Sequence, residues 1–180
     1  MEKLIIHGGL SIPREKDSLD SDKKNALFLI IKESFGILVS ENARNAVSHA
    51  IMMMEDNPIF NAGTGSKIQS DKKIRMSAGL MNGTENIFSG VVNVQNIKNP
   101  IEVASILSKE ENRILSGDQA TDFCRKNGIV KYNPQTPERL NEFNNNYSGK
   151  YGTVGAVAID SKGDFFAGTS TGGVGFEIPG

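Results

Sequence analysis

The residues after position 153 place the tightest limit on how this chain of 180 residues can fold. Two runs, 154–159 (VGAVAI) and 165–169 (FFAGT), are almost wholly apolar and are joined by the polar turn DSKGD. Runs that are apolar on both faces are typical of strands covered on both sides of a sheet, and a short turn containing glycine is typical of a hairpin. We therefore expect a β-hairpin within a fully buried sheet.

The segment just before this hairpin, residues 131–152, has the opposite character. It contains two prolines and a run of asparagines, a composition that can bury little apolar surface. We interpret it as a mobile linker that ends at Gly152-Thr153. On architecture alone, an ordinary surface loop before an interior hairpin is the simpler interpretation of this junction.

Upstream of the linker, hydrophobic periodicity predicts a mixture of strands and helices without an internal repeat. A proline at the first helical position supports one of the helices, and Pro58 ends another. Gly63 and Gly65 mark a tight turn. The expected elements are strands at 3–7 and 91–94, helices at 21–39, 40–56, 100–107 and 118–127, and a loop over 10–20.

Charge and composition exclude several classes of protein. The formal net charge is -1 and no basic run is dense enough to bind phosphate backbones, so we expect no nucleic-acid partner. No apolar run approaches the roughly 20 residues that cross a bilayer, so we expect no membrane partner. A single cysteine, Cys124, precludes an internal disulfide and, with no secretory signal, favours a cytoplasmic location.

Several blocks along the chain resemble the plant-type asparaginases (isoaspartyl peptidases), which are N-terminal nucleophile hydrolases. The blocks occur in the order of that family and span nearly the whole chain. They are residues 6–9 (IHGG), 54–66 (MEDNPIFNAGTGS), 96–101 (NIKNPI), 153–158 (TVGAVA) and 169–173 (TSTGG).

The resemblance implies an α+β fold, an αββα sandwich of the N-terminal nucleophile hydrolase type, incomplete at the C-terminus. It implies a precursor that cleaves itself between Gly152 and Thr153. Residues 1–152 would then form the α-subunit, with 131–152 as its linker, and residues 153–180 the beginning of the β-subunit. The expected assembly is a dimer of αβ units.

The same resemblance makes Thr153 the catalytic nucleophile. A glycine at position 152 leaves the scissile carbonyl unshielded, and Gly9 is expected near that bond. The amine freed by cleavage titrates at about 7.7–8.0, so it can act as the base for its own hydroxyl. No histidine is required, which suits a chain whose only histidines, His7 and His49, are expected at a strand end and in a helix.

The implied activity is hydrolysis of L-asparagine to aspartate and ammonia and of β-aspartyl dipeptides, without a cofactor. Thr171 would hydrogen-bond the nucleophile, and Asn61 would support the geometry of the site. Gly172 and Gly173 would let the backbone approach the substrate closely. Taken alone, Thr171 is a packing residue of a strand and Asn61 a turn residue.

The block at 54–66 resembles a sodium-binding loop in which backbone carbonyls hold the ion. A hard monovalent cation prefers oxygen ligands, so the identity of the side chains matters little there. The carbonyls implied by the resemblance are those of Met54, Glu55, Asn57, Phe60, Ala62 and Thr64.

Departures from the family pattern leave alternatives open. Ser77 and Asn82 stand where the family has aspartates, and Leu10-Ser11 follows the first block in place of Ala-Gly. Relatives continue beyond Gly180 with an arginine and an aspartate that bind the substrate. The alternatives are a catalytically inactive homologue or truncated fragment, and a glycosylasparaginase-like or taspase-like hydrolase. Glycosylasparaginases usually have asparagine where this chain has Gly172.

Overall fold

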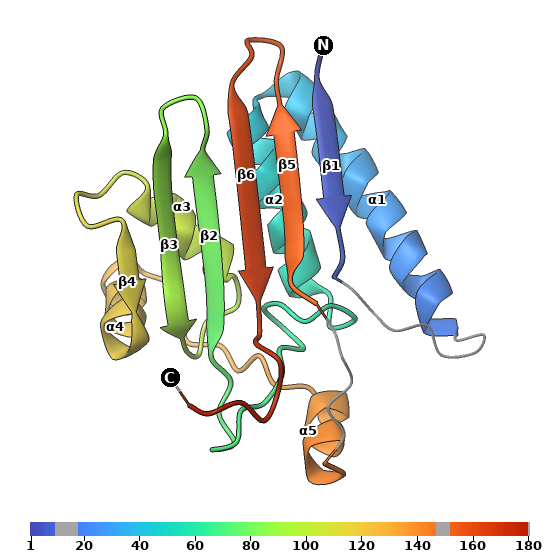
Figure 1. Ribbon diagram of the computed structural model, residues 1–180, viewed down its shortest axis with the longest axis vertical. Coiled ribbons are helices and arrows are strands. Elements are labelled where there is room, and N and C mark those ends of the chain that lie inside the picture. Colours follow the sequence, from blue (N-terminus) through green and yellow to red (C-terminus); the bar gives the residue numbers. More distant parts are fainter. Residues whose placement is uncertain (10–17, 147–151, 180) are drawn as a thin grey trace.

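A computed structural model of the chain describes residues 1–9, 18–146 and 152–179. Its strands form a single six-stranded sheet in the order β1-β5-β6-β2-β3-β4 (Figure 1). All neighbouring strands are antiparallel except β3 and β4, which are parallel. The strands are β1 (Lys3–His7), β2 (Met76–Asn82), β3 (Ile87–Val94), β4 (Ile114–Ser116), β5 (Val154–Ile159) and β6 (Phe165–Thr171).

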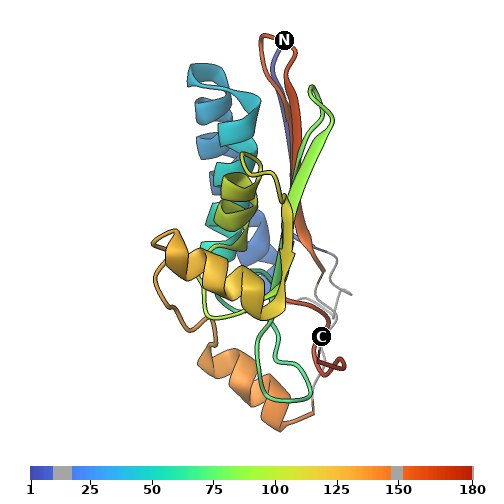
Figure 2. The same ribbon diagram turned by 90° about the vertical axis from the view of Figure 1, so that its left-hand side faces the viewer.

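The helices α1 to α4 cover one face of this sheet (Figure 2), and α5 lies beyond its lower end (Figure 1). No helix in the described ranges has the length and apolar character needed to cross a membrane. The helices are α1 (Ser18–Ser40), α2 (Ala43–Asp56), α3 (Pro100–Leu107), α4 (Gly117–Lys126) and α5 (Pro137–Asn144).

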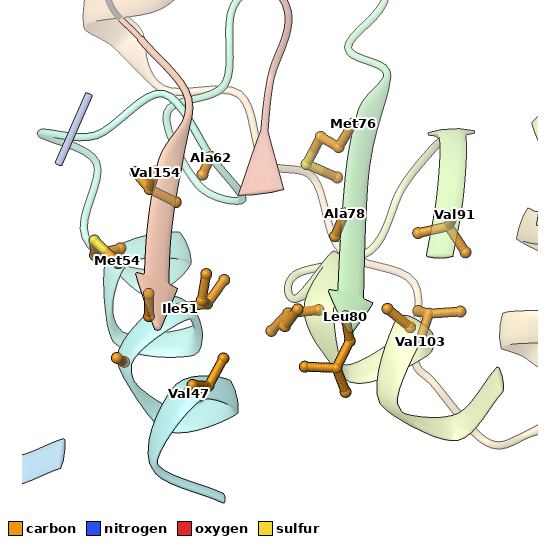
Figure 3. Close-up of a cluster of buried hydrophobic side chains, with 14 of the residues drawn as sticks. Val47, Ile51, Met54, Ala62, Met76, Ala78, Leu80, Val91, Val103 and Val154 are labelled. Atoms are coloured by element: carbon orange, nitrogen blue, oxygen red, sulfur yellow. The ribbon is translucent and has the colours of Figure 1, made fainter. Parts of the chain in front are cut away.

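The hydrophobic core lies between the sheet and helices α2 and α3 (Figure 3). Alternate residues of β5 point toward the helices, and they are almost completely buried because small side chains let α2 approach the strand closely. Core residues from β5 and β2 and from the two helices are Val154, Ala156, Ala158, Ala78, Leu80, Val47, Ile51, Met54, Ile101, Val103 and Ala104.

The turn between β5 and β6 is fixed by Asp160. Its carboxylate accepts hydrogen bonds from the backbone N–H groups of Lys162 (3.0 Å) and Asp164 (3.1 Å), which shape the turn. It also accepts one from the N–H of Ala43 (3.1 Å), at the start of α2. Asp160 thereby ties the hairpin to the N-terminus of the helix beneath it.

The opposite face of the sheet carries no helix in the described part of the chain (Figure 2). Ile5, Phe88, Val92, Ile114 and Val157 point out from it, with 37% to 70% of each residue exposed. The expectation that both faces of the hairpin are buried is therefore wrong for the described residues. They form two layers, helices on a sheet, with an apolar face left open.

The structure confirms the strand at 3–7, the hairpin and the helix at 100–107. It differs at Ser40, which ends α1 and does not begin α2; the side chain of Asn42 caps α2 instead. Residues 18–20 are helical where a loop was expected, while residues 10–17 lie outside the described ones. Strands β2 and β4 were not expected, and β3 is longer than predicted. Helix α5 lies within the segment interpreted as a linker.

Candidate functional site

Three hydroxyl side chains meet at one end of the open face. The register of the β5–β6 hairpin pairs Val154 with Ser170, and continuing it by one residue sets Thr153 opposite Thr171. On the other side of β6, Thr171 pairs with Ser77 of β2. Thr153, Thr171 and Ser77 line the same pocket of about 230 Å³. The strand register thus brings the predicted nucleophile beside the predicted supporting threonine.

The floor of this pocket is a row of residues that lack bulky side chains. Gly155 pairs with Thr169, Thr169 with Gly79, and Gly79 with Gly90, so the row crosses four strands. A Cβ atom on Gly79 would lie 2.9 Å from the ring of Phe88. Because Gly79 and Gly90 project no side chain, the open face is hollowed next to the hydroxyl groups.

The hydroxyl of Thr171 accepts a hydrogen bond from the backbone N–H of Gly173 (3.2 Å). A hydroxyl has one hydrogen to donate as well as lone pairs, so Thr171 can also donate to a neighbouring oxygen. The hydroxyl of Thr169 instead donates to the carbonyl of Val154 (3.0 Å), across the hairpin. Two threonines on one strand therefore serve different purposes.

Asn61 is buried, with 1% of the residue exposed, and it holds the two glycines that follow β6. Its side-chain amide donates to the carbonyl of Gly173 (2.6 Å), and its backbone carbonyl accepts from the N–H of Gly172 (2.9 Å). Its side-chain oxygen accepts from the N–H of Lys67 (3.1 Å). A Cβ on Gly172 would overlap Ser66, so this position is close-packed.

Gly9 follows β1 and its backbone lies against the carbonyl group of Gly152. Its φ of 84° belongs to the left-handed region that favours glycine. The backbone N–H of Gly9 donates to Nδ1 of His7 (3.4 Å), whose ring lies over Gly155 on the open face. The structure thus brings together Gly9 and Gly152, two of the residues predicted at the cleavage site.

The predicted ion-binding residues lie at the end of α2 (Met54 and Glu55) and in the loop that follows it, which we call the glycine loop (residues 57–66). Together the two segments form a closed backbone ring. The N–H of Thr64 donates back to the carbonyl of Glu55 (2.7 Å), and the N–H of Phe60 donates to the carbonyl of Asn57 (3.1 Å). Gly63, with a φ of 57°, turns the ring so tightly that a Cβ would overlap the backbone of Glu55. The described residues contain no cluster of His, Cys, Asp or Glu side chains suited to a metal ion.

The side chain of Glu55 is a feature that sequence reasoning missed, because only its carbonyl was expected to matter. It is completely buried, and burial raises the pKa of its carboxyl group to about 8. The nearby Ser170 side chain and the hydrogen bond from the N–H of Ile101 (3.0 Å) lower the pKa in part. A largely neutral carboxyl of α2 therefore binds the start of α3 and lies near Ser170 of β6.

Ser77 and Thr169 were also not predicted to line the pocket. Both lie in blocks of sequence that were singled out, but their position depends on the pairing of β2 with β6. The Ser77 hydroxyl accepts from the N–H of Asn93 (3.2 Å). Placing them at the pocket requires the register between strands that are distant in sequence, which the sequence pattern does not provide.

Known proteins resemble this chain along nearly its whole length. A profile of a family described as asparaginase matches residues 1–151 and 137–180. An isoaspartyl peptidase/L-asparaginase of Nostoc sp. is 40% identical over 198 residues, covering 97% of this chain and 62% of the relative. A protein of the same name from Synechocystis sp. is 38% identical over 194 residues, covering 97% and 59%. A plant-type L-asparaginase of Pyrococcus horikoshii is 36% identical over 200 residues, covering 97% and 64%. The chain thus spans about 60% of the length of these relatives.

Proposed function

Because the chain belongs to the asparaginase family, we propose that it carries the nucleophile of an amidohydrolase that acts on L-asparagine and β-aspartyl dipeptides. The observation that carries the proposal is the position of Thr153. It stands at the first residue of the hairpin, opposite Thr171 and beside a pocket on the open face. Gly152, the residue before it, has its carbonyl against Gly9.

The proposed first step is self-cleavage. The Thr153 hydroxyl attacks the carbonyl carbon of Gly152, the peptide C–N bond breaks, and the acyl group passes from the nitrogen to the Thr153 oxygen. Water then hydrolyses this ester, which leaves a carboxylate on Gly152 and a free amine and hydroxyl on Thr153. The close approach of Gly9 supports this step, because it limits where the Gly152 carbonyl can lie.

The proposed second reaction uses the same hydroxyl on substrate. The free α-amine of Thr153 takes the proton of its hydroxyl as the oxygen attacks the side-chain amide carbonyl of asparagine. The amine then gives that proton to the departing ammonia, and water hydrolyses the acyl-enzyme to aspartate. For a β-aspartyl dipeptide the leaving group is the amine of the second residue.

Around the nucleophile, Thr171 would donate its hydroxyl hydrogen to the Thr153 oxygen. Gly172 and Gly173 would bind the substrate through their backbone groups, since the space that a side chain would take is filled by Ser66 and by Glu177. Asn61 would act through this glycine pair, as its hydrogen bonds to Gly172 and Gly173 support.

The glycine loop suits a sodium ion held by backbone oxygens. Its ring is closed by the Thr64–Glu55 hydrogen bond, and a carbonyl that accepts one hydrogen bond keeps a second lone pair. We propose the ion as a structural element that stiffens the loop, with no part in proton transfer. Its proposed ligands are the carbonyls of Met54, Glu55, Asn57, Phe60, Ala62 and Thr64.

A second sheet is proposed to cover the open face and so complete an αββα sandwich. The exposed apolar residues of the neighbouring strands β3 and β4 support this, since a monomeric protein rarely leaves a large apolar patch in water. The covering strands would come from residues that the longer relatives have beyond the matched region. We further propose that two such αβ units form a dimer, which size-exclusion chromatography can test.

The strongest alternative is an inactive homologue, because neutral residues replace two family aspartates. The contacts of these residues weaken that alternative. The side-chain oxygen of Asn82 accepts hydrogen bonds from the N–H groups of Thr84 and Glu85 (both 3.1 Å), as an aspartate would. Ser77 likewise accepts from Asn93. Both replacements keep an acceptor where a carboxylate would supply one.

A glycosylasparaginase-like specificity is disfavoured at Gly172. This residue is buried, and a Cβ there would overlap the side chain of Ser66 and approach Asn61. An asparagine at this position would need the glycine loop to move. The close packing therefore fits the asparaginase pattern better.

The test is an assay of protein that includes whatever follows Gly180. Intact mass reports cleavage at Gly152-Thr153, while ammonia release from L-asparagine and aspartate release from a β-aspartyl dipeptide report hydrolysis. Thr153→Ala should abolish both, and Thr153→Ser should retain part of each because it keeps the hydroxyl. Undiminished activity in Thr153→Ala would overturn the mechanism. An uncut and inactive wild-type protein would favour the inactive homologue.

A further inference from the structure

The segment that precedes the proposed cleavage site is packed against the glycine loop. We call residues 132–144, which include α5, the α5 segment. The hydroxyl groups of Tyr132 and Thr64 lie 3.0 Å apart. The N–H of Gly65 donates to the carbonyl of Pro134 (2.9 Å), and the carbonyl of Gly65 accepts from Nε of Arg139 (2.5 Å). The α5 segment therefore binds the peptide groups on both sides of Gly65.

Arg139 is the centre of this contact. Only 6% of the residue is exposed, which is rare for an arginine. Its guanidinium is also paired with the carboxylate of Glu142, one turn further along α5, at 2.8 Å. This second partner compensates the buried charge, and the rigid planar group can aim its Nε at a single carbonyl.

Gly65 needs such support because its backbone is unusual. Its φ is 86°, and a Cβ there would overlap the backbone of Pro58. Two residues later, the N–H of Lys67 donates to the side chain of Asn61. Fixing Gly65 therefore also fixes the residue that orients Asn61.

From Asn61, hydrogen bonds lead directly to the proposed active site. Its side-chain amide holds the carbonyl of Gly173, and the N–H of Gly173 donates to the hydroxyl of Thr171. A continuous set of short contacts thus joins Arg139, before the cut, to Thr171, after it. The rings of Phe143 and Phe176 also stack across the two sides, with centroids 4.9 Å apart.

We propose that Arg139 is a positioning residue: the α5 segment stays docked after cleavage, and Arg139 sets the orientation of Thr171 through Gly65 and Asn61. The inference rests on the proposed function for its catalytic consequence, while the docking itself does not. It assigns a lasting role to a part of the chain whose composition suggests only a linker.

The experiment compares the complete wild-type protein, Arg139→Ala, Arg139→Lys and Arg125→Ala. Arg125 is the matched control, because its guanidinium also binds backbone, the carbonyls of Ile129 and Asn96 (2.8 and 2.6 Å), but lies on α4. In the cleaved enzymes, Arg139→Ala should lower kcat by about 10- to 100-fold with KM changed by less than about threefold, as misplaced catalytic groups do. Arg139→Lys should recover part of that loss, and Arg125→Ala should stay within about twofold of wild type.

A double variant tests the route of the effect. If Arg139 acts through Asn61, then Arg139→Ala combined with Asn61→Asp should lower kcat by little more than Asn61→Asp alone. If Arg139 acted independently of Asn61, the fold-loss in kcat of the double variant would be the product of the fold-losses of the two single variants. Multiplicative effects, or an unchanged kcat in Arg139→Ala beside an active wild type, would overturn the inference and leave the proposed function intact.

Hydrogen exchange tests the docking of the α5 segment even if the protein has no measurable activity. In Arg139→Ala the amides of Lys67, Gly172 and Gly173 should exchange faster by about 10-fold or more, while Arg125→Ala leaves them unchanged. An inactive, uncut wild type would defeat the proposed function, and this exchange would then decide the docking alone. Unchanged exchange of these amides in Arg139→Ala would overturn the inference.

Discussion

Gly9 and Gly152 are in backbone contact at the end of the sheet, so closely that a methyl group on Gly9 would overlap the carbonyl oxygen of Gly152. The two residues are far apart in sequence. They meet because β1 pairs with β5 in antiparallel fashion, so the end of β1 lies beside the start of β5. The contact makes Gly9 a sensitive position for testing self-cleavage.

Gly9→Ala should slow self-cleavage by at least about 100-fold, because misplacing reacting groups by about 1 Å costs about that much. The matched control is Gly128→Ala. Gly128 has a similar φ of 78°, but a Cβ there would meet nothing within 4 Å. Both variants therefore carry backbone strain, and only Gly9→Ala moves the scissile carbonyl. Intact mass followed over time gives the two rates, and equal rates would contradict the prediction.

Thr171→Val should lower turnover by about 10- to 100-fold, as expected for losing one hydrogen bond to a charged group. Valine keeps the shape of threonine, so the melting temperature should change little. Thr169→Val is the control, because its hydroxyl serves the Val154 carbonyl instead. Ammonia release measures the turnover of both variants. A loss of turnover in Thr169→Val as large as that in Thr171→Val would contradict the proposed hydrogen bond from Thr171 to the nucleophile.

A polypeptide of residues 1–180 should bind the dye ANS through its open face, where Phe88 and Ile114 are 49% and 57% exposed. Phe88→Asp should weaken dye binding in this polypeptide. In the complete protein the same change should lower stability by about 3 kcal/mol or more, because there the ring would be buried. Fluorescence titration and urea denaturation give the two quantities. Strong dye binding by the complete protein would argue against a covering sheet.

Cys124 should resist thiol reagents in the folded protein. It is fully buried on α4, and burial raises the pKa of its thiol from 9.0 to about 11. Since only the thiolate reacts, the raised pKa alone should slow labelling at pH 8 by about 100-fold relative to the unfolded chain. The rate should rise about tenfold per pH unit until the pH nears 11. Labelling with Ellman's reagent, with and without urea, checks both effects, and fast labelling of the native protein would contradict them.

The helices and the hairpin could be predicted because each depends on local pattern. Helix α5 shows how a local signal can be outweighed. Thr136 caps the helix by accepting a hydrogen bond from the N–H of Arg139, and Pro137 occupies its first turn. Both residue types are typical of a helix start and are visible in the sequence. The polar composition of the segment favoured a linker because almost none of it packs in the main core. Arg139 is the buried residue of α5, and a buried arginine does not contribute to hydrophobic periodicity.

The candidate site was predictable only as far as its residue types were recognisable in short blocks. The hydrogen bond between Asn61 and Gly173 joins residues 112 positions apart, and no spacing within either block implies it. The row of residues that crosses the sheet at the pocket likewise depends on the alignment of four strands. Strand β4 was missed for a simpler reason, since its three residues are too few to show a period.

The pairing of β1 with β5 also limits the order in which parts of this protein can fold. During synthesis the first strand emerges long before β5, its one neighbour among the described strands, and it must wait for residues 154–159. Pairing of strands so distant in sequence is slow, because the entropy cost of closing the long intervening loop comes before any stabilising contact forms. The Gly9–Gly152 contact forms only when that pairing does. If the proposed cleavage needs this contact, chains in which β1 and β5 have not paired would keep their Gly152-Thr153 bond, and cleavage would mark the chains that have folded this far.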